Sequence, residues 1–105
     1  DRLWASTSQG EVICLDRASG KEIWTQKLKY GIGNQPVLYK GLVIVGESSG
    51  SLRFFDSASG KPVGSFEPGK GLSAPVAIHE KTAQLYFVSN ESNIYALKVS
   101  WEKKL

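Results

Sequence analysis

The sequence predicts an all-β fold built from repeated four-stranded antiparallel meanders, and three observations lead to this prediction. First, residues 10–21 and 50–61 align at an offset of 40 residues, with six identities: Gly, Asp, Ala, Ser, Gly and Lys. Second, short runs rich in Val, Ile, Phe and Tyr are separated by turn-forming residues, as half-buried strands require. Third, no segment keeps a helical period over three turns. A meander of about 40 residues is typical of one blade of a β-propeller.

The individual strands follow from these runs in chain order. Leu3–Ala5 is the first copy of a strand that recurs at residues 43–45 and again at residues 86–88. The degenerate run 93–98 repeats residues 51–56 at an offset of 42. The middle unit shows the full set, with strands expected at residues 36–40, 42–46, 52–56 and 62–66, and turns at 40–41, 48–50 and 57–60.

The chain of 105 residues therefore predicts about two and a half blades, a fragment of a propeller with about six to eight blades. Residues 1–30 are expected to form a partial blade with strands two to four, and residues 31–69 a complete blade. Residues 70–105 are expected to form a blade whose last strand is degenerate. Such a fragment leaves apolar sheet faces open, so we expect the remaining blades, or self-association, to cover them.

Residues 14–24 carry the motif that names the repeat. They resemble the tryptophan-docking motif of PQQ-like (quinoprotein-type) β-propeller repeats, broadly A-x-D-x-x-T-G-K-x-x-W, with Cys14 in place of Ala and Ser19 in place of Thr. WD40 and kelch repeats fit less well, because their dipeptide signatures are absent. The residues that match the motif are Asp16, Gly20, Lys21 and Trp24.

Each residue of this motif has an expected structural role. Gly20 suits a tight turn with positive φ, and Asp16 can accept hydrogen bonds from the backbone of that turn. The resemblance implies that Trp24 docks flat between neighbouring blades. The second copy of the motif retains Asp56, Gly60 and Lys61.

Later copies depart from the motif in ways that affect blade contacts. Gly64 stands where the second docking Trp is expected, and Lys98 stands where the third copy would have Asp. We therefore expect the contacts after the first blade to be weaker, or to be filled differently by Phe66 and Trp101. All of these docking residues are interpreted as structural.

PQQ-like repeats occur both in quinone-binding dehydrogenases and in proteins that bind no quinone, so the resemblance to the repeat does not imply the cofactor. A non-catalytic role is favoured because the quinone-binding enzymes use a vicinal disulfide, which a single cysteine cannot form. Among PQQ-like propellers without quinone ligands, the sequence is most similar to the BamB family of outer-membrane assembly lipoproteins. This implies a periplasmic scaffold for protein–protein interaction, anchored by lipid through an N-terminus absent from this sequence. The alternatives are a fragment of a PQQ-dependent dehydrogenase and a propeller sensor domain of a signalling protein. No cofactor is expected, and PQQ would require ligands from absent blades.

Composition excludes several other classes of function. The net charge of +3 comes from 13 basic residues that are scattered along the chain, so no nucleic-acid partner is expected. No apolar run is long enough to cross a membrane, and the first residues do not resemble a signal peptide. Cys14 is the single cysteine, which excludes an intramolecular disulfide and predicts a small core residue.

No catalytic, cofactor-binding or metal-binding residue is assigned. His79, the single histidine, is interpreted as a surface residue at a hairpin, and residues 31–34 as a linker between blades. Residues 90–92 fit a glycosylation sequon, which is a common three-residue match. Partner binding is expected at loops 9–11, 47–49 and 90–92, which should lie together on one rim of the propeller.

Overall fold

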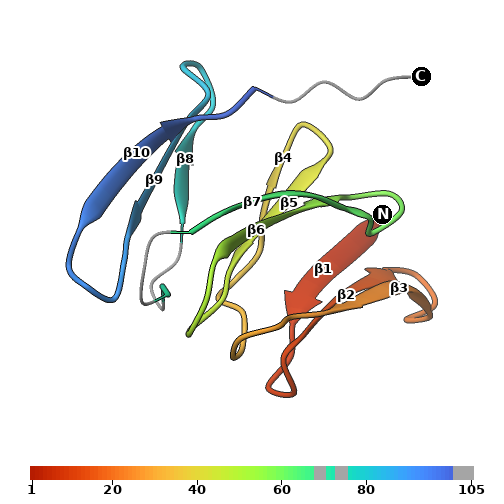
Figure 1. Ribbon diagram of the computed structural model, residues 1–105. Helices are drawn as coiled ribbons and strands as arrows, with labels where there is room; N and C mark the ends of the chain where they lie inside the picture. The colour runs from red at the N-terminus through yellow and green to blue at the C-terminus, as the bar shows by residue number, and fades with distance from the viewer. Residues whose placement is uncertain (68–70, 73–75, 101–105) are drawn as a thin grey trace.

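The computed structural model describes residues 1–67, 71–72 and 76–100, which form ten strands in three antiparallel sheets (Figure 1). These described residues contain no helix, and so none that could cross a membrane. The predicted all-β class and the arrangement of meanders are confirmed. The first two sheets contain β1 (Arg2–Ser6), β2 (Glu11–Asp16) and β3 (Glu22–Lys27), then β4 (Val37–Tyr39), β5 (Leu42–Gly46), β6 (Leu52–Asp56) and β7 (Pro62–Phe66). The third contains β8 (Ala77–His79), β9 (Gln84–Val88) and β10 (Ile94–Lys98).

The middle sheet is a complete meander in which sequence neighbours are also neighbours in space, in the order β4-β5-β6-β7. Lys40 and Gly41, which join β4 to β5, both have positive φ, at 47° and 80°. This is the backbone of a two-residue hairpin turn whose twist matches the strands that flank it. The predicted turn at residues 40–41 is thus confirmed.

The first and third sheets each contain three strands of the same meander. The first has the order β1-β2-β3, and its strands correspond to β5, β6 and β7 of the middle sheet at an offset of 40 residues. The third has the order β10-β9-β8, and its β8, β9 and β10 correspond to β4, β5 and β6 respectively. The predicted division at residues 30/31 and 69/70 stays a prediction, and its second boundary lies outside the described residues.

The repeat extends to irregularities of the backbone. The register between β2 and β3 shifts between Cys14 and Leu15, and the register between β6 and β7 shifts between Phe54 and Phe55. These positions are 40 residues apart. Because the two pairings share this register, Trp24 and Gly64 lie at matching positions. Trp24 lies opposite Cys14, and Gly64 lies opposite Phe54.

The core consists of two apolar layers, one between each pair of neighbouring sheets. Strand alternation allows this, because successive side chains point to opposite faces, so β5 and β6 supply both layers. The first layer contains Val12, Cys14, Trp24, Leu28, Val43, Val45 and Phe55, with Trp4 packed against it. The second contains Tyr39, Leu42, Ile44, Leu52, Leu72, Val76, Leu85 and Phe87.

Candidate functional site

Trp24 occupies the centre of the contact between the first and middle sheets. The residue is only 8% exposed, and its indole lies 6.3 Å from the Phe55 ring, centroid to centroid. Its Nε1 donates a hydrogen bond of 2.9 Å to the backbone carbonyl of Ser57. A Cβ on Gly60 would lie 2.5 Å from the indole, so the ring packs directly against a residue that has no side chain. The predicted docking residue therefore sits on the turn that follows β6.

That turn and its counterpart after β2 have the same hydrogen bonds. In the turn after β2, the Gly20 N–H donates to the Asp16 carbonyl at 2.8 Å, and the Asp16 N–H donates to the Lys21 carbonyl at 2.8 Å. The second turn repeats both distances, with Asp56, Gly60 and Lys61 in the equivalent places. Gly20 and Gly60 have φ angles of 73° and 77°, which favour glycine.

The Asp carboxylates hold these turns through the serine three residues later. The Ser19 hydroxyl donates to Asp16 Oδ2 at 2.7 Å, and the Ser59 hydroxyl donates to Asp56 Oδ2 at the same distance. The hydroxyl of Ser19 also lowers the pKa of Asp16 from its usual value of 3.8. Serine thus performs the task for which the repeat motif commonly has threonine.

Two further residues of β1 reach the turn that receives Trp24, and sequence reasoning did not identify them. Trp4 Nε1 donates to the same Ser57 carbonyl at 3.2 Å, and the Arg2 guanidinium donates to the Ala58 carbonyl at 3.1 Å. One signal was available, because Trp4 alternates with Leu3 and Ala5 along a strand. That alternation places Trp4 on one face of the sheet, and Leu3 and Ala5 on the other.

The contact between the middle and third sheets lacks the indole. Gly64 replaces the tryptophan, and Phe66 instead packs edge-on against Phe87 and Tyr95, with centroid distances of 6.0 and 5.5 Å. Phe66 thus contributes at this contact, as expected, whereas Trp101 lies outside the described residues. A pocket of about 260 Å³ remains beside Gly64.

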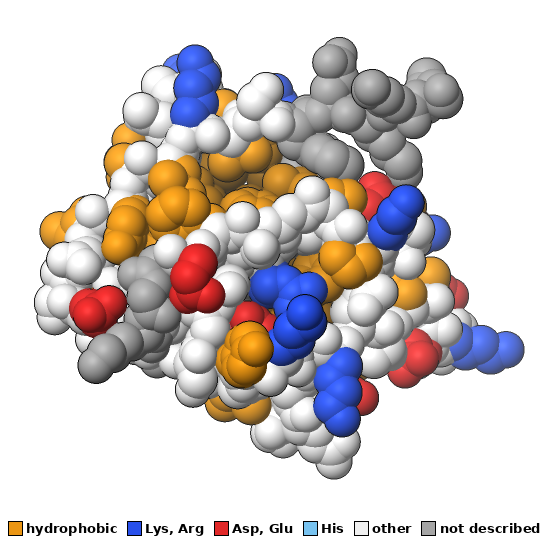
Figure 2. Space-filling model, viewed as in Figure 1, with side chains coloured by type: hydrophobic (Ala, Val, Ile, Leu, Met, Phe, Trp, Pro, Cys, Tyr) orange, Lys and Arg blue, Asp and Glu red, His pale blue; other side chains and the backbone are white. Residues whose placement is uncertain are grey.

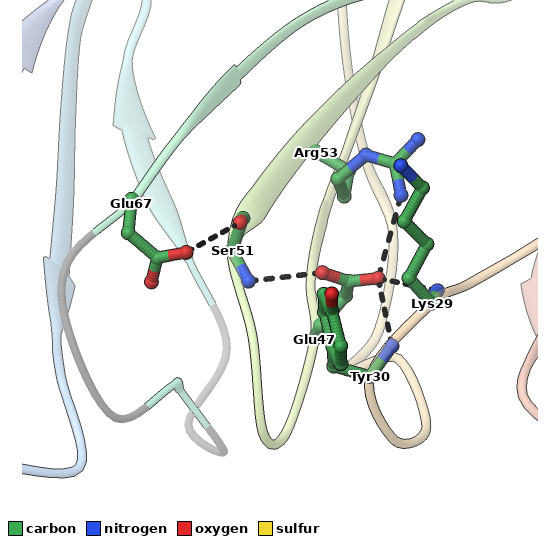
Figure 3. Close-up of polar contacts among 6 residues, drawn as sticks. All are labelled: Lys29, Tyr30, Glu47, Ser51, Arg53 and Glu67. Atoms are coloured by element: carbon green, nitrogen blue, oxygen red, sulfur yellow. Dashed lines mark hydrogen bonds and ion pairs between the residues drawn. The ribbon is translucent and has the colours of Figure 1, made fainter.

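Glu47 forms a buried polar cluster that sequence reasoning missed, because it was grouped with a loop on the rim (Figure 3). Its side chain is 1% exposed. Its carboxylate accepts hydrogen bonds from the backbone N–H groups of Lys29 at 2.8 Å, Tyr30 at 3.3 Å and Ser51 at 2.9 Å. Arg53 forms an ion pair with it at 3.4 Å. The carboxylate therefore fastens the linker after β3 to the hairpin between β5 and β6.

The linker also follows this hairpin through its main chain. The Ser48 N–H donates to the Ile32 carbonyl at 2.9 Å, and the Asn34 N–H donates to the Gly46 carbonyl at 3.0 Å. Ser48 Oγ accepts from the Ile32 N–H at 3.1 Å. Residues 31–34 thus join the first sheet to the middle one and lie against its β5–β6 loop.

The three loops that were predicted to share a rim lie on the same side of the sheets in Figure 1. Asn90 Nδ2 donates to the Ser48 carbonyl at 2.9 Å, which joins the third loop directly to the second. A Cβ on Gly10 would lie 3.0 Å from the Gly31 carbonyl, so the first loop is close to the linker. Asn90, the acceptor residue of the sequon, uses its side-chain amide in this contact.

The remaining residues that could take part in chemistry are His79 and Cys14. His79 is exposed at the end of β8, and its Nδ1 lies 3.0 Å from the hydroxyl of Thr82. Cys14 is fully buried in the first apolar layer, and burial raises the pKa of its thiol, with Arg2 acting in the opposite direction. Within the described parts of the chain, no group of three or more His, Cys, Asp or Glu residues is arranged to hold a metal ion.

Comparison with known proteins agrees with this architecture. The family described as outer membrane protein assembly factor BamB matches residues 1–102. A BamB of Marinobacter adhaerens is 30% identical over 76 residues, which cover 70% of this chain and 20% of that protein. A BamB of Francisella salina is 30% identical over 66 residues, covering 62% of this chain and 13% of that protein. The chain thus spans a fifth or less of these relatives and belongs to the BamB family of PQQ-like β-propellers.

Proposed function

We propose that this chain is part of a non-catalytic propeller scaffold that binds other proteins during outer-membrane protein assembly, on the periplasmic side of that membrane. The observation that carries the proposal is the family match over residues 1–102. The family match does not favour the alternatives, a dehydrogenase fragment or a sensor domain. A lipid anchor supplied by a preceding segment belongs to the same proposal.

The sheet faces at both ends of the described structure support a role within a larger assembly. On the first sheet, Leu3 is 52% exposed and lies opposite Leu15, on the face that points away from the middle sheet. On the third sheet, Ile94 is 80% exposed and lies opposite Val88. Because apolar cross-strand pairs rarely stay exposed to water, we propose that further blades of the same propeller cover both faces.

We propose that the motif residues Asp16, Gly20, Lys21, Trp24, Asp56, Gly60 and Lys61 are the docking elements of this ring. The two turns have matching hydrogen bonds and φ angles, but within the described residues only the second is in contact with an indole. A Cβ on Gly60 would lie 2.5 Å from Trp24, whereas a Cβ on Gly20 would meet no atom within 4 Å. The turn at Gly20 is therefore the expected receptor for the docking side chain of a preceding blade.

Paired alanine substitutions test the docking proposal. Both Gly60→Ala and Gly20→Ala introduce a side chain at positive φ, which costs about 1–2 kcal/mol. Gly60→Ala should cost more, because its methyl group also displaces Trp24. If a preceding blade docks on the turn at Gly20, Gly20→Ala in the full-length protein should destabilise as much as Gly60→Ala does. A cost for Gly20→Ala that is limited to the backbone penalty would show that this turn receives no indole.

Complementation tests the scaffold itself. In a bacterium that lacks its own BamB, the full-length protein that carries this chain should restore the amount of folded β-barrel proteins in the outer membrane. It should also co-purify with other components of the assembly machinery. A stably expressed periplasmic protein that restores neither the barrel proteins nor the association would refute the proposal.

A further inference from the structure

The pocket beside Gly64 has a mostly apolar lining contributed by two sheets, with Ser65, Lys98 and Ser100 also present. Leu42, Phe54 and Phe66 line it from the middle sheet, and Leu85, Leu97 and Val99 from the third sheet and the residue after it. Figure 2 shows hydrophobic side chains gathered around a hollow in the region between β7 and β10. The volume of about 260 Å³ lies close to the range of small-ligand sites.

The position of this pocket matches that of the indole at the first contact. Gly64 lies opposite Phe54 one residue before the register shift, as Trp24 lies opposite Cys14. Among the described residues, a Cβ on Gly64 would meet only Phe54 Cδ2, at an ordinary contact distance of 3.8 Å. The direction in which Trp24 extends at the first contact is therefore open at the second.

The residue that accepts the indole at the first contact also has a counterpart at the second. The Ser57 N–H donates to the Gly41 carbonyl at 2.9 Å, and 42 residues later the Val99 N–H donates to the Ala83 carbonyl at 2.7 Å. The Ser57 carbonyl accepts the indole of Trp24. Val99 holds the equivalent place in the third sheet and lines the pocket. The second contact thus has Val99 at the place of Ser57 and has no ring at the place of Trp24.

We propose that this pocket receives a tryptophan side chain from a partner polypeptide. Trp4 and Trp24 of this chain already donate hydrogen bonds to the Ser57 carbonyl at the first contact, so neither is available for the second. β7, which borders the pocket, is the last strand of its sheet, so an extended partner segment has access along it. Only the source of the tryptophan rests on the proposed scaffold function, because the pocket itself follows from the repeat.

The test uses the full-length protein with N-acetyl-tryptophanamide as the probe and N-acetyl-leucinamide as the matched control. Ligand-observed NMR should show saturable binding of the tryptophan probe, with a dissociation constant on the order of 0.1–1 mM. Gly64→Trp, which fills the pocket, should weaken binding at least tenfold. Gly64→Ala should leave the affinity within about twofold, because the methyl group occupies little of the pocket. If Gly64→Trp does not fold, Gly64→Leu replaces it as the blocking variant.

Each outcome decides the proposal. Tryptophan-selective binding that the filled variant blocks supports it. Equal binding of the leucine probe, or binding that Gly64→Trp leaves unchanged, overturns it. Binding that appears only after Trp101→Ala would show that the chain's own tryptophan occupies the pocket, which also overturns it. Failure of the scaffold function would instead appear as lost complementation, with probe binding intact.

Discussion

Trp24→Ala tests the contact between the first and middle sheets. The residue is 8% exposed, and a buried tryptophan removes about 150–250 Å² from water, worth about 4–6 kcal/mol at 25 cal/mol per Å². The lost hydrogen bond adds little, because the Ser57 carbonyl keeps Trp4 as a donor at 3.2 Å. Partial collapse of the neighbours offsets some of the loss. We therefore expect a decrease of about 3–5 kcal/mol in the free energy of unfolding.

Urea unfolding of the full-length protein, followed by far-UV circular dichroism, measures this change without relying on tryptophan fluorescence. Trp24→Phe is the matched control, because it keeps an aromatic ring against Gly60 and Phe55 but loses the N–H group. It should cost about 1–2 kcal/mol. A loss below about 1 kcal/mol for Trp24→Ala would refute the inference that the indole orders this contact.

Three further predictions follow from the buried and hydrogen-bonded groups. Cys14 should react with a thiol reagent at pH 8 only as fast as the contact between the first and middle sheets opens, because the thiol is buried and burial raises its pKa. Trp24→Ala should accelerate this labelling, which stopped-flow absorbance would measure. Glu47→Gln should cost more than about 2 kcal/mol in urea unfolding, because the amide presents a donor to a site lined by N–H groups and Arg53; a neutral result would mean that the cluster adds no stability. The Ser19 hydroxyl lowers the pKa of Asp16 in the folded protein. The ionised Asp16 carboxylate therefore stabilises the fold above the usual pKa of 3.8, and this stabilisation is lost as pH falls through the lowered pKa. Asp16→Asn should reduce the fall of the urea midpoint as pH drops below about 4 and should have no such effect between pH 6 and 8.

The sequence predicted the fold well because the repeat and the strand pattern depend on local chemistry. Turn residues such as Gly41 and Gly60 mark positions where φ is positive, and the residue type alone indicates such a position. Phe66 was predicted as a substitute for the missing tryptophan, and it lies two residues after Gly64, so strand alternation places it on the same face. These features recur at a nearly constant offset, so each copy supports the interpretation of the others.

Contacts between distant segments could not be predicted in the same way. Glu47 occurs in a polar loop, and nothing in its neighbourhood distinguishes it from a solvated residue. Its burial depends on Lys29 and Tyr30, which come from the linker that leaves the preceding sheet. Trp4 reaches Ser57 across 53 residues for the same reason. Such pairs are set by how two sheets stack, which a motif within one repeat does not encode.

The two contacts between sheets show how a repeat protein can vary one position while keeping its backbone. The bulge and the hydrogen bond of the residue after the third strand of each meander are retained at the second contact. Gly64 does not have positive φ and a Cβ there would meet only an ordinary contact, so neither backbone nor space requires glycine. An indole would fit the repeat and fill the pocket, as Trp24 does at the first contact. The fold should therefore tolerate a larger side chain at Gly64, and the cost of such a side chain would fall on whatever the pocket receives.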